Sequence, residues 1–314
     1  MTGLSGVGSS RAAPLSMCRQ MAASSATSEL LTTYTAIPLV GLVASEGLPF
    51  PLYLRTAART WVLYQPRGTV LDESHIGRLR SEGVPGLFIE DRDRAAYSRR
   101  VEAEVASILR DKSVPLQRRC DVLHGVAAEV ASDLLAPRPE AADVVRAQRL
   151  MMTTSGLLLR EQQSFHAVRR VLRAADGVAS HSLNVAFLSM GLAQKVLTGD
   201  GTALARVGLA GLLHDIGRVD GDEQDDAAEG AVRSARVLES LNLPRSVVEA
   251  VNAHRDPESA VGAARVIGLV NLFEEVYSSQ EPRVGVYDAL RILSQAYRGK
   301  FDERMARSLV HLFR

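Results

Sequence analysis

A histidine and an aspartate stand side by side, as His214 and Asp215, after an apolar run from Val207 to Leu213. Histidine offers a neutral nitrogen and aspartate an anionic oxygen, which together suit divalent zinc, manganese, iron or magnesium. Near a helix end both side chains can reach one ion, although they diverge by about 100° around the axis. We expect Gly217 to end this helix in the left-handed conformation. The competing interpretation is a helix end capped by polar side chains, without a metal.

The composition is that of an ordinary globular protein. The 314 residues suffice for two domains, each with its own core. The formal net charge of +1 gives no reason to expect binding to nucleic acid or to an anionic membrane. No apolar run approaches the roughly 18 residues of a membrane span, and two cysteines, Cys18 and Cys120, fit a reducing compartment. We therefore expect a cytoplasmic protein that contacts neither nucleic acid nor membrane.

The N-terminal third divides into two parts. Residues 1–34 are rich in Ser, Ala and Gly and lack a signal-peptide core, so we expect a disordered leader. Residues 35–92 combine short apolar runs with turn signals, which predicts a small α/β module containing Trp61 in its core. Its expected elements are an extended segment at 37–43, strands at 60–64 and 87–90, and a short helix capped by Asp72 or Ser74 that reaches Leu79.

From residue 93 onward, apolar residues recur every three to four positions, which predicts helices. We expect a helical connector over 93–175 and an all-helical domain over 176–314. The helices expected in that domain cover 181–196, 203–214, 231–241, 244–254, 263–278, 286–296 and 302–313. The acidic stretch 220–229 is interpreted as a solvated loop rather than a second metal cluster. The fold class is mainly α: an all-helical C-terminal bundle, preceded by a small α/β module and connecting helices.

Three segments of the last domain share a pattern. Residues 176–186 contain His181, residues 212–218 contain the His-Asp pair, and residues 264–271 form an apolar helix that ends on Asn271. Together they resemble the motifs of the HD superfamily of metal-dependent phosphohydrolases, and most closely its HD-GYP branch, the bacterial cyclic di-GMP phosphodiesterases. Residues 36–135 are similar to a region often fused upstream of HD-GYP domains. The resemblance implies an all-helical domain that splits a phosphodiester with two or three metal ions.

The chain departs from the family pattern at several ligand positions. Asn271 replaces the last aspartate, Gly230 stands where a histidine is expected, and the paired histidines followed by glutamate correspond to His254-Arg255-Asp256. The Gly-Tyr-Pro signature is absent. Asn271 keeps a carbonyl oxygen but no negative charge, and Arg255 would repel a metal ion. With an effective dielectric constant near 20, two unit charges about 4 Å apart interact by about 4 kcal/mol. These departures argue against a centre of two or three ions.

The resemblance carried onto these positions gives a candidate site. The candidate metal ligands are His181, His214, Asp215, His254 and Asn271. The candidate catalytic residues are Asp215 and Arg218, where Arg218 replaces a usual lysine, and the candidate phosphate ligands are Arg218 and Arg255. The expected cofactor is a divalent transition metal (iron, manganese or zinc), as one ion or none. His75, His124 and His166 show no partner pattern and are interpreted as ordinary histidines.

Three functions are compatible with this pattern. The first is an HD-GYP-like signalling protein that is catalytically impaired and binds a cyclic dinucleotide, another nucleotide or a signalling protein such as a diguanylate cyclase. The second is an active metal-dependent phosphodiesterase or phosphohydrolase, acting on cyclic di-GMP or another nucleotide with a reduced metal site. The third is a scaffold whose helical domain forms a homodimer. Metal content and turnover distinguish the first two.

Overall fold

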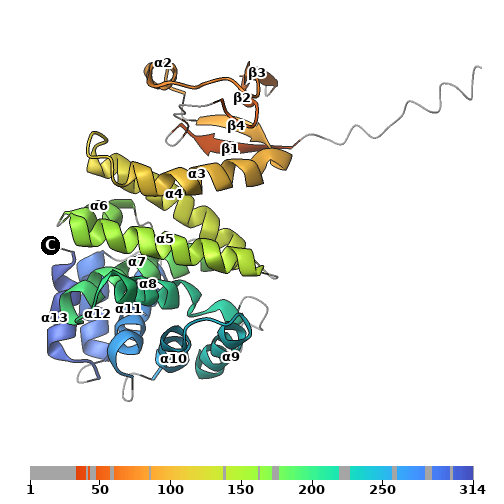
Figure 1. Cartoon of the computed structure of the whole chain (residues 1–314). Helices are drawn as coiled ribbons and strands as arrows, with labels where there is room; N and C mark the ends of the chain where they lie inside the picture. The colour runs from red at the N-terminus through yellow and green to blue at the C-terminus, as the bar shows by residue number, and fades with distance from the viewer. Residues whose placement is uncertain are drawn as a thin grey trace, which may run out of the picture.

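The computed structural model describes residues 33–39, 42, 47–56, 60–84, 86–136, 139–161, 163–171, 177–218, 227–256, 260–279, 285–297 and 300–313. Within these residues, a small antiparallel sheet with one helix stands at one end of a body made of helices (Figure 1). The mainly α fold class is therefore confirmed. Nearly all of the expected leader, the centre of the proline-rich linker at 136–139 and most of the acidic stretch 220–229 lie outside the described residues.

The N-terminal module is a four-stranded sheet in which every described strand pair is antiparallel, with the order β1-β4-β2-β3. Its elements are β1 (Tyr34–Pro38), β2 (Leu52–Arg55), β3 (Trp61–Gln65), α2 (Glu73–Ser81) and β4 (Gly86–Glu90). The register pairs Tyr34 with Glu90 and Pro38 with Gly86, so β1 is as long as its partner β4. Strand β1 therefore begins and ends earlier than the extended segment expected at 37–43.

Two local predictions in this module have clear outcomes. The carboxylate of Asp72, and not Ser74, caps α2, because its Oδ1 accepts hydrogen bonds from the amides of Ser74 at 2.9 Å and of His75 at 3.0 Å. Trp61 is only half-buried, and it stacks on the ring of Tyr34 with a centroid distance of 4.5 Å. The expectation that Trp61 lies in the core is therefore correct only in part. The core itself consists of apolar residues that include Phe50, Leu52, Leu87 and Ile89.

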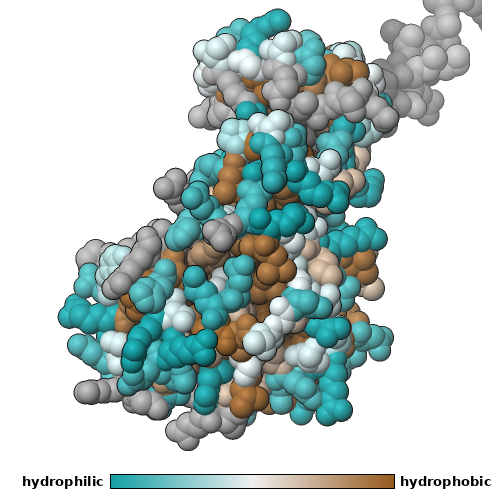
Figure 2. All heavy atoms as spheres, turned by 60° about the vertical axis from the view of Figure 1, so that its left-hand side comes forward, coloured by the Kyte–Doolittle hydropathy of each residue, from teal (hydrophilic) through white to brown (hydrophobic). Residues whose placement is uncertain are grey.

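The connector links this module to the rest of the molecule. It consists of α3 (Arg94–Ile108), α4 (Leu116–Leu134), α5 (Ala141–Arg160) and α6 (Ser164–Val171). Helix α5 packs against both α4 and α8, and buried apolar side chains form one continuous cluster from the sheet to the C-terminal helices. The separate cores expected for two domains are not observed among the described residues. On the face shown in Figure 2, hydrophilic side chains predominate, and hydrophobic ones gather in patches below the N-terminal sheet.

The C-terminal helices agree with the predicted ones to within a few residues. They are α7 (Val178–Val196), α8 (Gly201–Leu213), α9 (Ala227–Ser240), α10 (Arg245–Ala253), α11 (Gly262–Ser279), α12 (Val286–Ala296) and α13 (Glu303–His311). Every residue of α7 from Ser182 to Ala193 is buried, because α4, α8, α11 and α13 surround this helix. None of the described helices has the length and hydropathy that crossing a membrane requires.

A tight turn follows α8. It contains the short 3₁₀ helix η2 (Ile216–Arg218), with Gly217 at its centre. Gly217 is not among the glycines with positive φ, so the predicted left-handed cap is wrong. Close packing requires a glycine at this position instead, since a Cβ atom at Gly217 would lie 2.4 Å from the amide nitrogen of Ser234 in α9. The amide of Gly217 also donates a hydrogen bond to Ser234 Oγ at 3.0 Å, which holds the turn against α9.

Gly217→Ala is expected to lower the free energy of unfolding by about 2 kcal/mol, because the added methyl group must displace the backbone of α9. Gly125→Ala in α4 is the matched control, since a Cβ atom there meets nothing within 4 Å. Alanine is favoured over glycine inside a helix by about 1 kcal/mol, so the control should be slightly stabilised. Denaturant unfolding measures both changes, and a Gly217→Ala protein as stable as the control would contradict the close packing.

Candidate metal centre

Polar side chains from three parts of the helical domain meet at one buried point. His181 lies in the first turns of α7, His214 and Asp215 follow the end of α8, and Asn271 lies in the middle of α11. His214 and Asn271 are fully buried, Asp215 is almost so, and His181 is half-buried. His181, His214 and Asp215 each place one ligand atom within 4.8 Å of the others. The structure thus brings together His181, His214 and Asp215, three of the five candidate metal ligands.

Hydrogen bonds determine which nitrogen of each histidine faces this point. Nδ1 of His214 lies 2.8 Å from the carbonyl oxygen of Gly211, and Nδ1 of His181 contacts a carboxylate oxygen of Glu274. Carbonyl and carboxylate oxygens only accept, so both Nδ1 atoms carry a hydrogen, and both Nε2 atoms face the common point. A histidine metal ligand is commonly oriented in this way by a bond to its other ring nitrogen.

The side-chain amide of Asn271 completes the convergence. Its Nδ2 donates to Glu275 Oε1 at 3.0 Å, so its Oδ1 points to the histidines and lies 3.0 Å from Nε2 of each. The two Nε2 atoms are 3.2 Å apart. A shared cation, either a proton on one imidazole or a metal ion, satisfies three nitrogen and oxygen atoms that lie this close together. With bonds of about 2.1 Å, neighbouring ligands of one ion lie about 3.0–3.4 Å apart, so the spacing suits a single ion.

Asp215 adds the anionic ligand and also binds two arginines. Its Oδ2 lies 3.4 Å from His214 Nε2, 3.3 Å from an Nη atom of Arg255 and 3.3 Å from one of Arg218. Burial alone would raise the pKa of the Asp215 carboxyl, but the neighbouring His214 and the two guanidinium groups hold that pKa well below its ordinary value. Asp215 is therefore ionised, and its carboxylate has enough lone pairs to serve an ion and an arginine together.

Arg255 lies inside the site rather than at its surface. Its side chain is 12% exposed, and Nη1 donates to Glu275 Oε1 at 2.7 Å, the oxygen that also accepts from Asn271. Burial alone would lower the pKa of Arg255, but Asp215 and Glu275 raise it above its ordinary value, so the guanidinium stays charged. A second ion sharing the Asp215 carboxylate would lie beside this charge and be repelled. The residues present fit one divalent ion and do not fit a pair.

His254 stands outside the converging group. Its ring is edge-on to that of His214 at a centroid distance of 5.2 Å, and its Nδ1 donates to the carbonyl of Val251 at 2.6 Å. Burial, followed by the proximity of His214, lowers the pKa of His254 to about 3, so the ring is neutral. Its Nε2 is buried and has no hydrogen-bond partner among the described residues. The structure therefore places His254 beside the centre but not among the atoms that converge on it.

Arg218 packs over Gly230, the position where the family resemblance predicts a histidine. A Cβ atom on Gly230 would lie 3.1 Å from Cγ and Cδ of Arg218, so the arginine stem packs directly over this glycine. The Arg218 side chain is 36% exposed while its guanidinium contacts Asp215. Arg218 thus lies at the partly open flank of the site, where a phosphate from solvent could meet it.

A glutamate that the sequence patterns did not indicate anchors the site. Glu274 is 1% exposed and accepts hydrogen bonds from His181, from Asn184 Nδ2 at 3.1 Å and from Ser278 Oγ at 2.8 Å. Burial would raise the pKa of Glu274, but the contact with His181 and the other hydrogen bonds hold it below its ordinary value. The available signal was its spacing: a residue three positions after Asn271 in an apolar helix lies on the same helix face.

Comparisons with known proteins agree with this arrangement. The family model described as "HD domain" matches residues 178–290, a segment that contains all the converging side chains. No curated protein matches the chain. A solved structure described as Bd1817, a HDG"Y"P protein from Bdellovibrio bacteriovorus, resembles the chain with a TM-score of 0.64 at 17% identity, covering 90% of this chain and 99% of that one. Residues 178–290 therefore match the HD domain family, and the chain as a whole has a fold similar to that of the HDG"Y"P protein.

Proposed function

We propose that the protein is a signalling member of the cyclic di-GMP system that binds a nucleotide phosphate at this site and is impaired in hydrolysing it. The observation that carries the proposal is the pairing of Arg255 with Asp215 at 3.3 Å, which puts a permanent cation beside the carboxylate that metal ions would otherwise share. The resemblance of the motifs to the HD-GYP branch supports cyclic di-GMP as the nucleotide.

The two arginines supply the phosphate-binding groups in this proposal. A guanidinium has five N–H donors, and Asp215 engages only some of those on Arg255 and Arg218. Nε of Arg255 is buried and has no hydrogen-bond partner among the described residues, so Asp215 and Glu275 leave this guanidinium only partly satisfied. Planar donors of this kind suit the oxygens of a phosphodiester, and the partly exposed Arg218 lies where such a ligand would enter.

In this proposal, Arg255 at a position where the family has a histidine would also weaken hydrolysis. An ion held by His181, His214, Asp215 and Asn271 would polarise a phosphoryl oxygen and lower the pKa of water. Arg255 can neutralise phosphate charge as an ion does, but its raised pKa means that it does not release a proton or generate a nucleophile. Because Asn271 is neutral where the family pattern has an aspartate, the ligand set also carries one negative charge fewer. Binding is therefore retained in this proposal, while activation of water is reduced.

A second function is favoured by the converging donor atoms themselves. Nε2 of His181, Nε2 of His214 and Oδ1 of Asn271 lie within 3.2 Å of one another, and Asp215 adds a negative charge next to them. This donor set is sufficient for one ion, and one ion can assist phosphoester hydrolysis. The alternative is therefore an active phosphodiesterase or phosphohydrolase with a reduced metal site, acting on cyclic di-GMP or another nucleotide.

Binding and turnover of cyclic di-GMP by the purified full chain, measured together with Mn²⁺ or Fe²⁺, test the proposal. We expect calorimetric binding, with turnover about a thousandfold below the roughly 10 s⁻¹ typical of enzymes. Arg255→Ala should weaken binding by about tenfold, since a charged hydrogen bond is lost. Arg245→Ala is the matched control, because Arg245 is 90% exposed and pairs only with its own helix neighbour Glu249 among the described residues.

The possible results separate the functions. Turnover at an ordinary enzyme rate would contradict impairment and establish the alternative. If cyclic di-GMP, its linear dinucleotide and GTP all fail to bind, nucleotide signalling at this site is wrong, and binding of a protein partner such as a diguanylate cyclase is the remaining function. Equal loss of binding in the Arg255 and Arg245 variants would contradict the assigned role of Arg255.

A further inference from the structure

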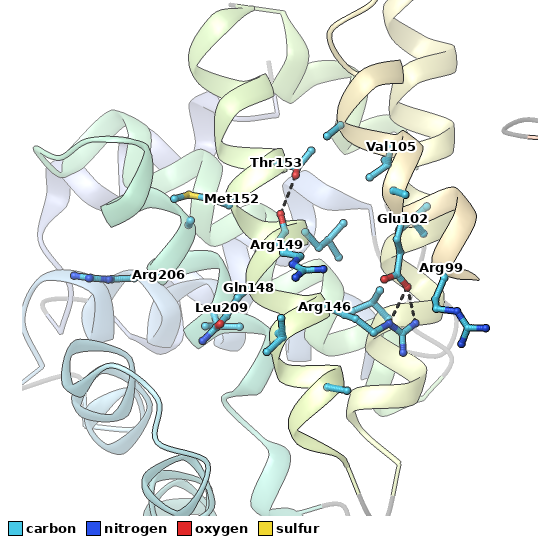
Figure 3. Close-up of a pocket in the computed structure, with 18 of the residues that line it drawn as sticks. Arg99, Glu102, Val105, Arg146, Gln148, Arg149, Met152, Thr153, Arg206 and Leu209 are labelled. Atoms are coloured by element: carbon cyan, nitrogen blue, oxygen red, sulfur yellow. Dashed lines mark hydrogen bonds and ion pairs between the residues drawn. The ribbon is translucent and has the colours of Figure 1, made fainter. Parts of the chain in front are cut away.

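A groove of about 1180 Å³ lies between helices α3, α4, α5 and α8, and the converging side chains of the metal centre do not line it (Figure 3). Its walls are largely apolar and include Val105 of α3, Val145 and Met152 of α5, and Leu209 of α8. Small-molecule sites usually enclose about 300–1,000 Å³, so this groove is large for such a ligand. Its size and lining are better suited to an elongated apolar occupant.

Helix α5 presents an exposed apolar stripe along this groove. Val145, Met152 and Leu159 are 42%, 44% and 50% exposed. They follow one another at intervals of seven residues, which places them on one face of the helix over a length of about 21 Å. Val145 and Met152 line the groove, and Leu159 extends the stripe beyond it. Exposed apolar rows of this kind mark helix faces that pack against another element.

Three arginines border the stripe. Arg99 of α3, Arg149 of α5 and Arg206 of α8 line the groove and are exposed, and no carboxylate of the described residues pairs with them. The remaining arginine of the lining, Arg146, is already paired with Glu102 at 2.7 Å, and Figure 3 shows this pair at one side of the groove. The groove therefore combines an apolar floor with three cations, from three different helices, that no carboxylate of the described residues neutralises.

We propose that this groove docks an amphipathic α-helix of a partner protein that carries acidic residues beside its apolar face. The apolar face of that helix would pack on Val145 and Met152, and its carboxylates would meet Arg99, Arg149 and Arg206. A second copy of this chain is a poorer occupant, because twofold packing of α5 on itself brings Arg149 of both copies into one interface, where like charges repel. The proposal is independent of what the metal centre does.

Two synthetic peptides of about 16 residues, long enough to span the stripe as helices, are suitable probes. Both carry leucines at helical spacing, and the flanking positions are glutamate in one and lysine in the other. Fluorescence anisotropy with the full chain should show at least tenfold tighter binding of the glutamate peptide at low salt. The difference should shrink as sodium chloride is raised, because exposed charges are screened. Hydrogen exchange should show protection of α5 by the bound peptide.

Variants at exposed positions locate the binding surface. Arg149→Glu/Arg206→Glu should reverse the preference between the peptides, and Met152→Asp should weaken both by about tenfold. Arg304→Glu on α13, which is exposed and outside the groove, is the control for a charge reversal elsewhere on the surface and should change neither. Equal binding of the two peptides, binding of neither, or protection elsewhere would overturn the proposal. So would a dimer in light scattering that Met152→Asp converts to a monomer, since the groove would then be a self-association face.

Discussion

His214→Ala should lower the metal content of the purified full chain from about one equivalent to less than about a tenth, because it removes a buried ligand from the centre of the converging group. Nε2 of His214 lies 3.2 Å from Nε2 of His181 and 3.0 Å from Oδ1 of Asn271. Among the described residues, no other side chain contacts both of these atoms, so none can replace His214 as a ligand. Elemental mass spectrometry after purification with added manganese or iron measures the content.

His166→Ala is the matched control for this experiment, since His166 is an exposed histidine of α6 and should leave the metal content unchanged. Glu274→Gln should give an intermediate result. It leaves every ligand atom in place but weakens the orientation of His181, and losses of about 10- to 100-fold in metal affinity are typical of such partners. A wild-type protein without metal, or a His214→Ala protein with as much as the wild type, would contradict the one-ion site.

Arg255→His should raise the metal content towards about two equivalents. The substitution removes the cation beside Asp215 and supplies a neutral nitrogen donor next to His254, whose Nε2 has no partner among the described residues. Relief of repulsion worth about 4 kcal/mol corresponds to roughly a thousandfold in affinity for a second ion. Titration calorimetry with manganese measures the number of ions and their affinities.

Arg255→Lys separates charge from ligand chemistry in this second experiment. Lysine keeps the positive charge, so this variant should bind no more metal than the wild type. Arg255→Ala removes the charge without adding a donor and should fall between the two. An Arg255→His protein that still holds one equivalent, with unchanged folding, would show that the guanidinium is not what excludes a second ion.

The parts of the site that sequence could predict are those whose spacing is local. His214 and Asp215 are adjacent in the sequence, and the resemblance assigned His181 and Asn271 to the same site. The structure places these four side chains close together. Glu274 was not predicted because its role depends on a contact with a residue 93 positions away. Helical periodicity gives no information about contacts between residues so far apart in the sequence. In the folded protein this contact is evident, because the carboxylate of Glu274 is buried against His181.

The fold shows the same division between local and distant causes. Helix positions followed from apolar periodicity, and most boundaries were close. The predicted conformation of Gly217 was wrong because glycine is required there by the close approach of Ser234, 17 residues along the chain, and not by the end of α8. Strand β1 was misplaced because its length is fixed by pairing with β4, from Tyr34–Glu90 to Pro38–Gly86. Separate cores were expected because the sequence pattern changes near residue 176. That change does not reveal that α5 packs both against α4, which precedes this position, and against α8, which follows it.

The burial of α7 on all sides has a consequence for how the chain folds. Its neighbours include α4, which precedes it, and α13, which lies near the C-terminal end of the described residues. Helix α7 therefore cannot reach its native surroundings until helices from distant parts of the chain have assembled around it, and contacts of such long range slow folding. The connector and the helical domain should accordingly unfold in one cooperative transition, with the geometry around His181 formed only when that transition is complete.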